Sequence, residues 1–366
     1  MNLDNMSILE TIELSERSKD PDILEQLSTD EDADVREAVA GNENCYPHVL
    51  EHTLSKDSSW LVRRAVVWNE NCPPHVLEDL STDGSEDVRT AVAWNENCPP
   101  RALITLSTDD SGYVRVNVSQ NKSSPIFALL RLFFEFLVYV KENPNYINCD
   151  LNELLSYVEH EDPSFRAGIA AHPKCPPHVL EHPLSTDEDE EVRQVVAKNK
   201  NCPPHVLEHT LCKDKNEDVR KAVAENKNCP PHVLKKPLSK DGSADVRIAV
   251  AKHPKCPDQA LINLSYDSNI KVRLAVANNP NCPDPALINL CDDPNNDVRN
   301  AVGDNPRSFD IPQIAEKLKA FNKKTINEYT KTKIPKNLNS PSHLHKSINT
   351  DLELLLALHK YLMRGN

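Results

Sequence analysis

Glycine is scarce in this sequence. The chain of 366 residues has only seven glycines, at positions 41, 84, 112, 168, 242, 303 and 365. No two of them lie within a dozen residues of each other, whereas the dinucleotide-binding fingerprint and the P-loop both need closely spaced glycines. This scarcity excludes glycine-rich phosphate-binding loops.

Long apolar runs are also missing. The longest one, Ile126 to Val140, contains Arg131 and Glu135 and is too short to cross a bilayer. The start of the chain, residues 1–20, is polar and acidic and lacks the apolar segment of a secretory signal peptide. We therefore expect no membrane span and a cytoplasmic location.

Basic side chains are outnumbered by acidic ones. The chain has 42 Lys and Arg against 56 Asp and Glu, which gives a formal net charge of −14. Residues 309–366 hold ten basic and five acidic side chains, which leaves 32 basic and 51 acidic for residues 1–308, a balance of −19. Because neutralising phosphates requires clustered Lys and Arg, this charge disfavours a nucleic-acid partner.

The most prominent feature of the sequence is an internal repeat of 26 or 27 residues. Arginines mark it at positions 36, 63, 89 and 115, and again at 166, 193, 220, 247, 273 and 299. The gap of 51 residues between Arg115 and Arg166 is close to two repeat lengths, and Val140-Lys141 at its middle is in register with the Val-Arg of the other repeats. About eleven repeats are therefore predicted, one of them heavily eroded.

Each repeat predicts two short helical elements. Apolar residues just before the Arg and two and three residues after it form one face of a short α-helix. Six residues after the Arg comes an Asn, or His172 or His253, which we interpret as the stop of this helix because Asn and His tolerate positive φ. A Cys followed by Pro begins the second element, expected to be 3₁₀-like because Pro183 and Pro237 soon interrupt it.

Such a unit cannot bury its apolar face alone, so the predicted fold is an all-α solenoid of stacked repeats. The run Asp-Val-Arg-Thr-Ala-Val-Ala-Trp-Asn-Glu-Asn-Cys-Pro-Pro at 87–100 resembles the leucine-rich repeat variant family, a HEAT-like α-solenoid. The resemblance covers roughly Pro21 to Ser308 and implies a right-handed solenoid with one α-helix and one 3₁₀-helix per unit. One founding member of that family has an N-terminal cysteine cluster for an iron–sulfur centre, but the first cysteine here is Cys45, so no cofactor is predicted.

The repeat divides the chain into three regions. These are an N-terminal cap with a half-repeat at 1–30, the solenoid at 31–308 with eroded repeats at 116–165, and a basic C-terminal extension at 309–366. Two helical stretches are predicted in the extension, Ile311–Thr330 and Thr350–Leu362.

Charged residues recur with the repeat. An Asp stands six residues before nine of the ten arginines, His160 is the exception, and the eroded repeat has Glu135 there. A row of arginines that binds phosphates or acidic peptides is one interpretation. We favour a structural role, in which each Arg bonds Asp and backbone carbonyls within and between repeats. On this basis Arg220 is expected to pair with carboxylates such as Asp214.

Eight of the eleven cysteines also occupy one repeat position, nine residues after the Arg. Three of them have histidines nearby, as in Cys45-x-x-His48-x-x-x-His52. Zinc prefers four ligands, and each unit supplies three at most. Equivalent positions in successive layers lie about 8–10 Å apart, which is too far to share an ion. The cysteines are therefore predicted to be small buried hydrophobes rather than metal ligands or disulfides.

All three tryptophans, Trp60, Trp68 and Trp94, fall in the second and third repeats. Trp68 and Trp94 share the position five residues after the Arg, which is mostly polar in other repeats and so should face solvent. We predict that they form an apolar patch for a ligand with an apolar anchor and basic flanks. The alternative is that the rings pack on each other or under the edge of the stack.

The eroded repeats contain four of the seven phenylalanines, Phe127, Phe133, Phe134 and Phe136. Arg131 and Glu135 are spaced i, i+4 and are expected to pair on a longer helix. A bulkier local core is the favoured interpretation. The alternative is a docking or self-association surface over 126–140.

No catalytic constellation departs from the repeat positions, so the sequence favours a non-enzymatic scaffold that binds a protein or peptide. One alternative is a HEAT-like enzyme similar to bilin lyases or DNA glycosylases. Another is weak nucleic-acid or membrane-surface contact through the basic C-terminal extension.

Overall fold

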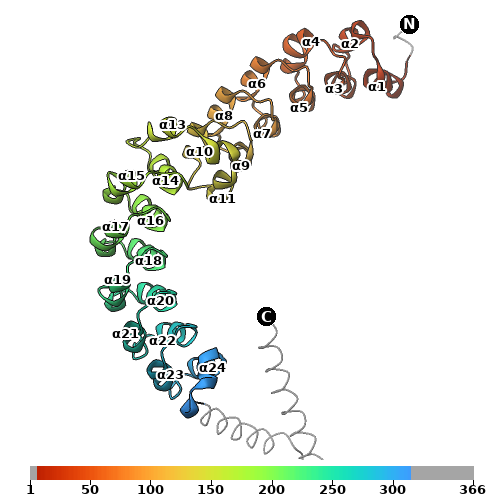
Figure 1. Ribbon diagram of the computed structural model, residues 1–366. Helices are drawn as coiled ribbons and strands as arrows, with labels where there is room; N and C mark the ends of the chain where they lie inside the picture. Colours follow the sequence, from red (N-terminus) through yellow and green to blue (C-terminus); the bar gives the residue numbers. More distant parts are fainter. Residues whose placement is uncertain (1–5, 315–366) are drawn as a thin grey trace, which may run out of the picture.

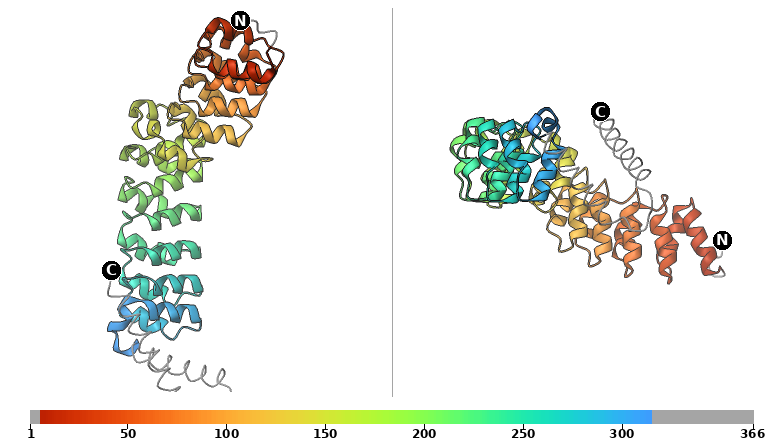
Figure 2. Two further views of the ribbon diagram at one scale, coloured as in Figure 1. Left: turned by 90° about the vertical axis from the view of Figure 1, so that its right-hand side faces the viewer. Right: turned by 90° about the horizontal axis from the view of Figure 1, so that it is seen from below.

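The computed structural model describes residues 6–314, and these residues form a curved stack of two-helix layers with no β-strand among them (Figure 1). The layers follow one another in chain order, as two further views show (Figure 2). The fold is therefore the all-α solenoid that the repeat predicts.

One helix of each layer carries the repeat Arg, or Lys141 in the eroded repeat, and lines the inner side of the curve (Figure 1). Successive inner helices pack against each other except at the bend, where Pro163–Ala171 packs on Ile126–Arg131 instead of on Leu137–Glu142. The inner helices are α3 (Ala33–Gly41), α5 (Trp60–Trp68), α7 (Glu86–Trp94), α9 (Gly112–Gln120), α11 (Leu137–Glu142), α14 (Pro163–Ala171), α16 (Glu190–Lys198), α18 (Glu217–Glu225), α20 (Ala244–Lys252), α22 (Ile270–Ala277) and α24 (Asn296–Asp304). Before them, α1 (Ile8–Arg17) packs on α3 in the same way.

The other helices lie on the outer side of the curve, and most begin at or next to a proline. They are α2 (Pro21–Leu27), α4 (Pro47–His52), α6 (Pro74–Leu80), α8 (Pro100–Leu106), α10 (Ile126–Arg131), α12 (Pro144–Asn148), α13 (Leu151–Leu155), α15 (Pro177–Glu181), α17 (Pro204–His209), α19 (Pro231–Lys235), α21 (Asp258–Leu264) and α23 (Asp284–Leu290). Proline suits this position because the first helical turn leaves its N–H groups unpaired.

The second element differs from the 3₁₀-like helix that was expected, because it is α-helical. In α6 the Ser81 N–H donates to the Leu77 carbonyl at 3.0 Å, an i to i−4 bond. In the described part of the chain, a short 3₁₀-helix follows the outer α-helix only in the 27-residue repeats, where that α-helix ends earlier. These are η2 (Leu54–Lys56), η3 (Leu184–Thr186), η4 (Leu211–Lys213) and η5 (Leu238–Lys240). A last one, η6 (Pro306–Asp310), ends the described repeats.

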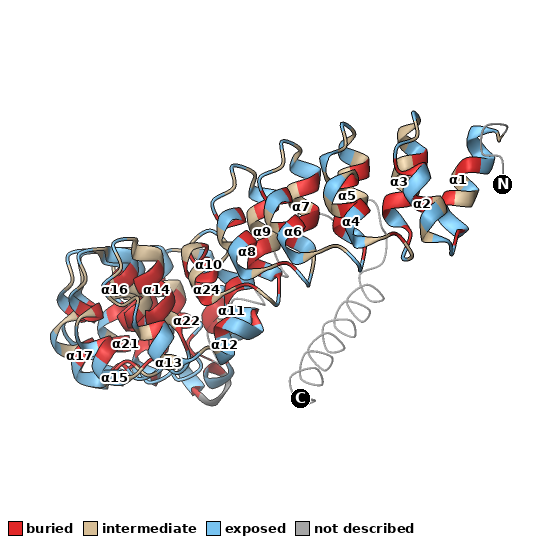
Figure 3. Ribbon diagram, turned by 90° about the horizontal axis from the view of Figure 1, so that it is seen from above, coloured by how far each residue is buried: buried red, intermediate tan, exposed pale blue. Residues whose placement is uncertain are grey.

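The core lies between the two rows of helices and runs the length of the stack (Figure 3). Its members are mainly the Val and Ala of the inner helices, the Val and Leu of the outer helices, and seven of the eight repeat cysteines. Burying an aliphatic side chain stabilises the fold by about 1.5–3 kcal/mol. Each layer contributes several, so stability accumulates from layer to layer.

The repeat Arg and Asp form a ladder that joins each layer to the next. The Arg63 Nε and Nη2 donate to the Asp83 carboxylate of the following repeat at 2.6 and 2.9 Å. The Arg63 Nη1 donates to the Asp57 carbonyl of its own repeat at 2.6 Å. The same pairing recurs at Arg36–Asp57, Arg89–Asp109, Arg115–Glu135, Arg166–Asp187, Arg193–Asp214, Arg220–Asp241, Arg247–Asp267 and Arg273–Asp293.

The ladder confirms that the arginines bond within and between repeats, with one correction. The carboxylate partner of Arg220 is Asp241, not Asp214, whose own carboxylate pairs with Arg193. Asp214 offers Arg220 its backbone carbonyl instead, at 2.7 Å. The arginine side chains are thus occupied by structural bonds.

The interpretation of the repeat Asn as a positive-φ helix stop is wrong. No residue in the described part of the chain has a positive φ, and Asn69 is extended, at φ −74° and ψ 126°. Its amide nitrogen donates to the carbonyls of Ala40 and Asn42 in the previous layer, at 2.7 and 2.8 Å, while its oxygen accepts the Asn71 N–H. The side chain is buried and ties two layers together through three backbone groups.

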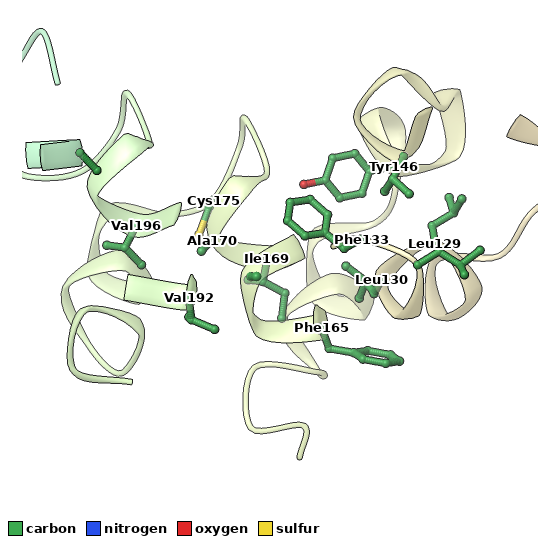
Figure 4. Close-up of a cluster of buried hydrophobic side chains, with 14 of the residues drawn as sticks. Leu129, Leu130, Phe133, Tyr146, Phe165, Ile169, Ala170, Cys175, Val192 and Val196 are labelled. Atoms are coloured by element: carbon green, nitrogen blue, oxygen red, sulfur yellow. The ribbon is translucent and has the colours of Figure 1, made fainter. Parts of the chain in front are cut away.

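The chain bends where the eroded repeats lie (Figure 1). Here Phe133, Tyr146 and Phe165 are fully buried, and Figure 4 shows their rings in one cluster with aliphatic side chains. Gly168 of α14 allows the close approach of α10, since a Cβ there would clash with Leu130. The predicted bulkier local core is therefore present.

The predicted Arg131–Glu135 pair does not form. Helix α10 ends at Arg131, so the longer helix that would align the two side chains is missing. Glu135 instead accepts from Arg115 Nε at 2.9 Å and completes the ladder, while Arg131 lies over the Phe127 ring at 4.9 Å.

The division into cap, solenoid and extension stays a prediction. The part of the extension from residue 315 on, with most of its two predicted helical stretches, lies outside the described residues.

Candidate functional site

Trp68 and Trp94 lie at the last positions of α5 and α7, two inner helices that pack side by side. Their side chains are 51% and 55% exposed, respectively. They are followed by the buried Asn69 and by Asn95, so the inter-layer bonds of these amides fix the helix ends that present the rings. The structure thus brings the two rings to the same end of neighbouring helices on the inner side of the curve.

Trp60 is separate from this pair. It is the first residue of α5, eight residues before Trp68, which corresponds to about 12 Å along the helix axis. The Arg64 guanidinium lies over its ring at 5.0 Å, and the ring is 37% exposed. Trp60 therefore extends the apolar surface of α5 toward its other end.

Sequence reasoning missed Tyr113, which is 75% exposed at the start of α9. It stands two residues before the repeat Arg, a position occupied by Asp34, Asp87 or Asp218 in other repeats. The signal was the same as for the tryptophans, a large ring at a position that is otherwise polar. Tyr113 lies in the first turn of α9, at the same end of the inner helices as Trp60, whereas Trp68 and Trp94 lie at the other end. We call Trp68 and Trp94 the inner aromatic surface.

Exposed carboxylates flank the inner aromatic surface. Glu70 and Glu96 follow the two tryptophans by two residues each, and both are exposed. Glu86 and Asp87 are also exposed, but they lie at the start of α7, the end opposite to Trp94, where Glu86 accepts a hydrogen bond from Ser111 Oγ at 2.7 Å. Large rings beside carboxylates suit a ligand that combines an apolar anchor with basic groups.

Seven of the eight repeat cysteines are buried in the core, as predicted, whereas Cys72 is half-buried against it. Burial raises the pKa of Cys202, Cys229 and Cys256 to about 12. Their thiols therefore stay protonated near neutral pH, and a thiolate is the form that binds metals.

The histidines near these cysteines face outward instead of toward the sulfur. His48 Nε2 lies 3.0 Å from the Glu25 carboxylate of the previous layer, and His205 Nε2 lies 2.9 Å from Glu181 in the same way. Within residues 6–314, no group of three or more His, Cys, Asp or Glu side chains is arranged to hold a metal ion.

The surface of the eroded repeats is only partly apolar. Leu137, Val138 and Tyr139 of α11 are 40%, 62% and 42% exposed, whereas Phe133 is buried and Phe134 is half-buried. Self-association through 126–140 stays a prediction.

Comparisons with known proteins give structural neighbours only. No family model and no curated protein matches the chain. A solved structure described as a leucine-rich repeat variant with a novel repetitive protein structural motif is 24% identical, covers 68% of this chain and 87% of its own, and has a TM-score of 0.41. A crystal structure of an engineered protein is 16% identical, covers 85% of this chain and 93% of its own, and has a TM-score of 0.34.

The α-solenoid itself rests on the helices and contacts of this chain. In addition, none of the helices within residues 6–314 has both the length and the apolar character that crossing a membrane requires.

Proposed function

We propose that this protein is a non-enzymatic scaffold that binds a protein or peptide through the inner aromatic surface. The observation that supports this most is the exposure of Trp68 and Trp94 on adjacent inner helices, at a position that other repeats fill with small or polar residues. Large rigid rings provide contact area at low entropic cost and dominate many binding interfaces.

The chemistry around the rings supports a partner with an apolar anchor and basic flanks. Glu70 and Glu96 are exposed two residues after the two rings, and Glu96 also pairs with Lys122 at 3.4 Å. Carboxylates at the rim of an interface steer a cationic partner and repel nucleic-acid phosphates. The partner class is thus a protein or peptide rather than a nucleic acid.

A cytoplasmic location is part of the same proposal. All eleven cysteines are free, and seven of the eight repeat cysteines are buried. Proteins with many unpaired cysteines are typical of reducing compartments, because oxidising ones favour disulfides.

A peptide library displayed on phage and selected on the whole chain tests this proposal. We expect enriched peptides with one large apolar residue flanked by Lys or Arg. Their affinity should fall by at least about 1–2 kcal/mol for a Trp68→Lys, Trp94→Asn variant, the lower range for loss of a hot spot.

The matched control is Tyr266→Lys, because Tyr266 is another highly exposed ring, at 71%, but lies after α21 and away from α5 and α7. Both variants should keep the helicity and melting temperature of the parent. Peptides that bind the tryptophan variant as well as the parent would place the binding surface elsewhere.

A further inference from the structure

The Arg–carboxylate ladder is interrupted once between Arg36 and Asp293, at α11. Lys141 stands where the other repeats have Arg, and His160 stands where the next repeat should offer a carboxylate. His160 cannot replace that carboxylate, because its ring stacks on Phe165 at 3.7 Å and its Nδ1 accepts the Asp162 N–H at 3.1 Å. Within the described residues, the Lys141 ammonium is left without an ion pair.

Lys141 borders a pocket instead. The pocket has a volume of about 200 Å³ and lies between the turn and helix at 133–141 and α16. Both α11 and α16 belong to the inner row of helices (Figure 1). Phe134 and Leu137 form an apolar wall on one side, and Val195 and Lys198 of α16 lie on the other.

The pocket carries an excess of positive charge, because Lys141 and Lys198, both exposed, line it against the one carboxylate of Glu191. Partial burial and then the neighbouring Lys198 ammonium lower the pKa of Lys141. Glu191 also lines the pocket, but within residues 6–314 it forms no ion pair with either lysine. Two ammonium groups without counter-ions repel each other, and a bound anion would relieve that repulsion.

We propose that this pocket binds a carboxylate carried on a small apolar group. Lys141 and Lys198 pair with the carboxylate, and Phe134 and Leu137 contact the apolar part. The two lysines favour an anion, and a carboxylate can accept charge-assisted hydrogen bonds from both. A bare inorganic ion would leave Phe134 and Leu137 without a contact, so an apolar group attached to the carboxylate fits the pocket better. The same chemistry is found in free arylalkyl acids and at the C-terminal residue of a peptide. This inference does not rest on the proposed function.

In the first experiment the whole chain is titrated with 3-phenylpropionate and, separately, with its uncharged amide. NMR signals of the lysine side chains monitor binding and the pKa of Lys141. We expect saturable binding of the acid, an upward shift in the pKa of Lys141, and binding of the amide at least about fivefold weaker, as loss of a charge-assisted bond predicts.

Variants locate the site. Lys141→Gln and Lys198→Gln should each weaken binding of the acid at least about fivefold. Lys252→Gln is the matched control, since Lys252 ends α20 just as Lys198 ends α16 but does not line the pocket. Circular dichroism checks that all three variants fold.

A second pair of probes is the peptide acetyl-Ala-Ala-Phe as free acid and as C-terminal amide. Three results would overturn the proposal: equal binding of acid and amide, an equal loss of affinity in the Lys252→Gln control, or no saturable binding of either 3-phenylpropionate or the peptide acid. Binding of the peptide acid but not of 3-phenylpropionate would assign the pocket to peptide C-termini, and binding of both would assign it to apolar carboxylates in general.

Discussion

The Arg220 guanidinium donates two hydrogen bonds, of 2.7 and 3.0 Å, to the Asp241 carboxylate in the next repeat. The Asp241 oxygen also accepts the Ser243 N–H at 2.9 Å, so one carboxylate holds both a neighbouring layer and its own loop. Burial alone would raise the pKa of Asp241, but the bonds from Arg220 and Ser243 outweigh it and lower the pKa below its usual value.

A double-mutant cycle tests this link. We expect a coupling of about 1–3 kcal/mol in the free energy of unfolding between Arg220→Ala and Asp241→Ala. Either substitution alone already removes the bidentate pair, so the double variant should lose less stability than the sum of the two single variants. A second cycle pairs Arg220→Ala with Asp214→Ala, which leaves the accepting Asp214 backbone carbonyl in place. Its coupling should be much smaller, and equal couplings would contradict the assigned partner. Denaturant unfolding measures both.

A substitution of the repeat Asn distinguishes a helix stop that needs positive φ from a buried amide that bonds two layers together. Asn226 donates to the carbonyls of Ala197 and Asn199 at 2.6 and 3.1 Å and accepts the Asn228 N–H at 2.8 Å. Asn226→Gly should lower the free energy of unfolding by about 2–3 kcal/mol, since three buried backbone groups lose their partner. A helix stop that needs positive φ would instead accept Gly without loss.

Asn226→His is the control for this prediction. His253 fills the equivalent place in the next repeat, where its Nε2 bonds to the Asn226 carbonyl at 3.2 Å and its Nδ1 accepts the Lys255 N–H. The His variant should therefore be closer in stability to the parent than the Gly variant. Thermal unfolding of the three proteins decides the order.

The ladder and the Asn show what sequence alone could and could not predict. The spacing of Val, Ala and Arg predicts the inner helix and the stack, because one apolar face recurs every layer. It cannot choose between Asp214 and Asp241 for Arg220, because Arg220 has one Asp six residues before it and another in the next repeat. The bonds of Asn226 to Ala197 lie between layers, and no spacing within one repeat reveals them.

The exposed tryptophans of the candidate site could be predicted from the sequence, but their surroundings could not. A repeat defines which positions face solvent, so Trp68 and Trp94 stood out as rings at a polar position, and the structure places both in solvent. Tyr113 follows the same logic and was missed. The Lys141 pocket could not be foreseen, because it depends on how α11 meets α16 across the bend.

The repeat thiols should be unreactive in the folded protein. With the pKa of Cys229 raised to about 12 by burial, the thiolate fraction at pH 8 is on the order of one in ten thousand. Iodoacetamide labelling followed by mass spectrometry should therefore modify Cys229 and its repeat equivalents slowly in the native state and fast after unfolding. Half-buried Cys149 should react earlier. Fast native labelling of Cys229 would show that the layers open.

The two buried histidines make stability depend on pH near neutrality. Burial lowers the pKa of His172 and of His253. The unfolded chain therefore binds protons at a higher pH than the folded chain. Their stabilising contribution is complete above the usual histidine pKa of about 6.5 and is lost as the pH falls below it, by at most about 1.4 kcal/mol per pH unit for each proton.

The control for this last prediction comes from the repeat itself, since Asn occupies the same position in most layers. A His172→Asn, His253→Asn variant should stay folded, because Asn can make the same inter-layer bonds. Its free energy of unfolding should lose the dependence on pH between about 7 and 5. The decline at lower pH should remain, because it comes from ladder carboxylates such as Asp241, whose lowered pKa gives stability that is lost only as they are protonated. Denaturant unfolding at a series of pH values measures both steps, and an unchanged profile between pH 7 and 5 in the variant would show that other groups titrate there.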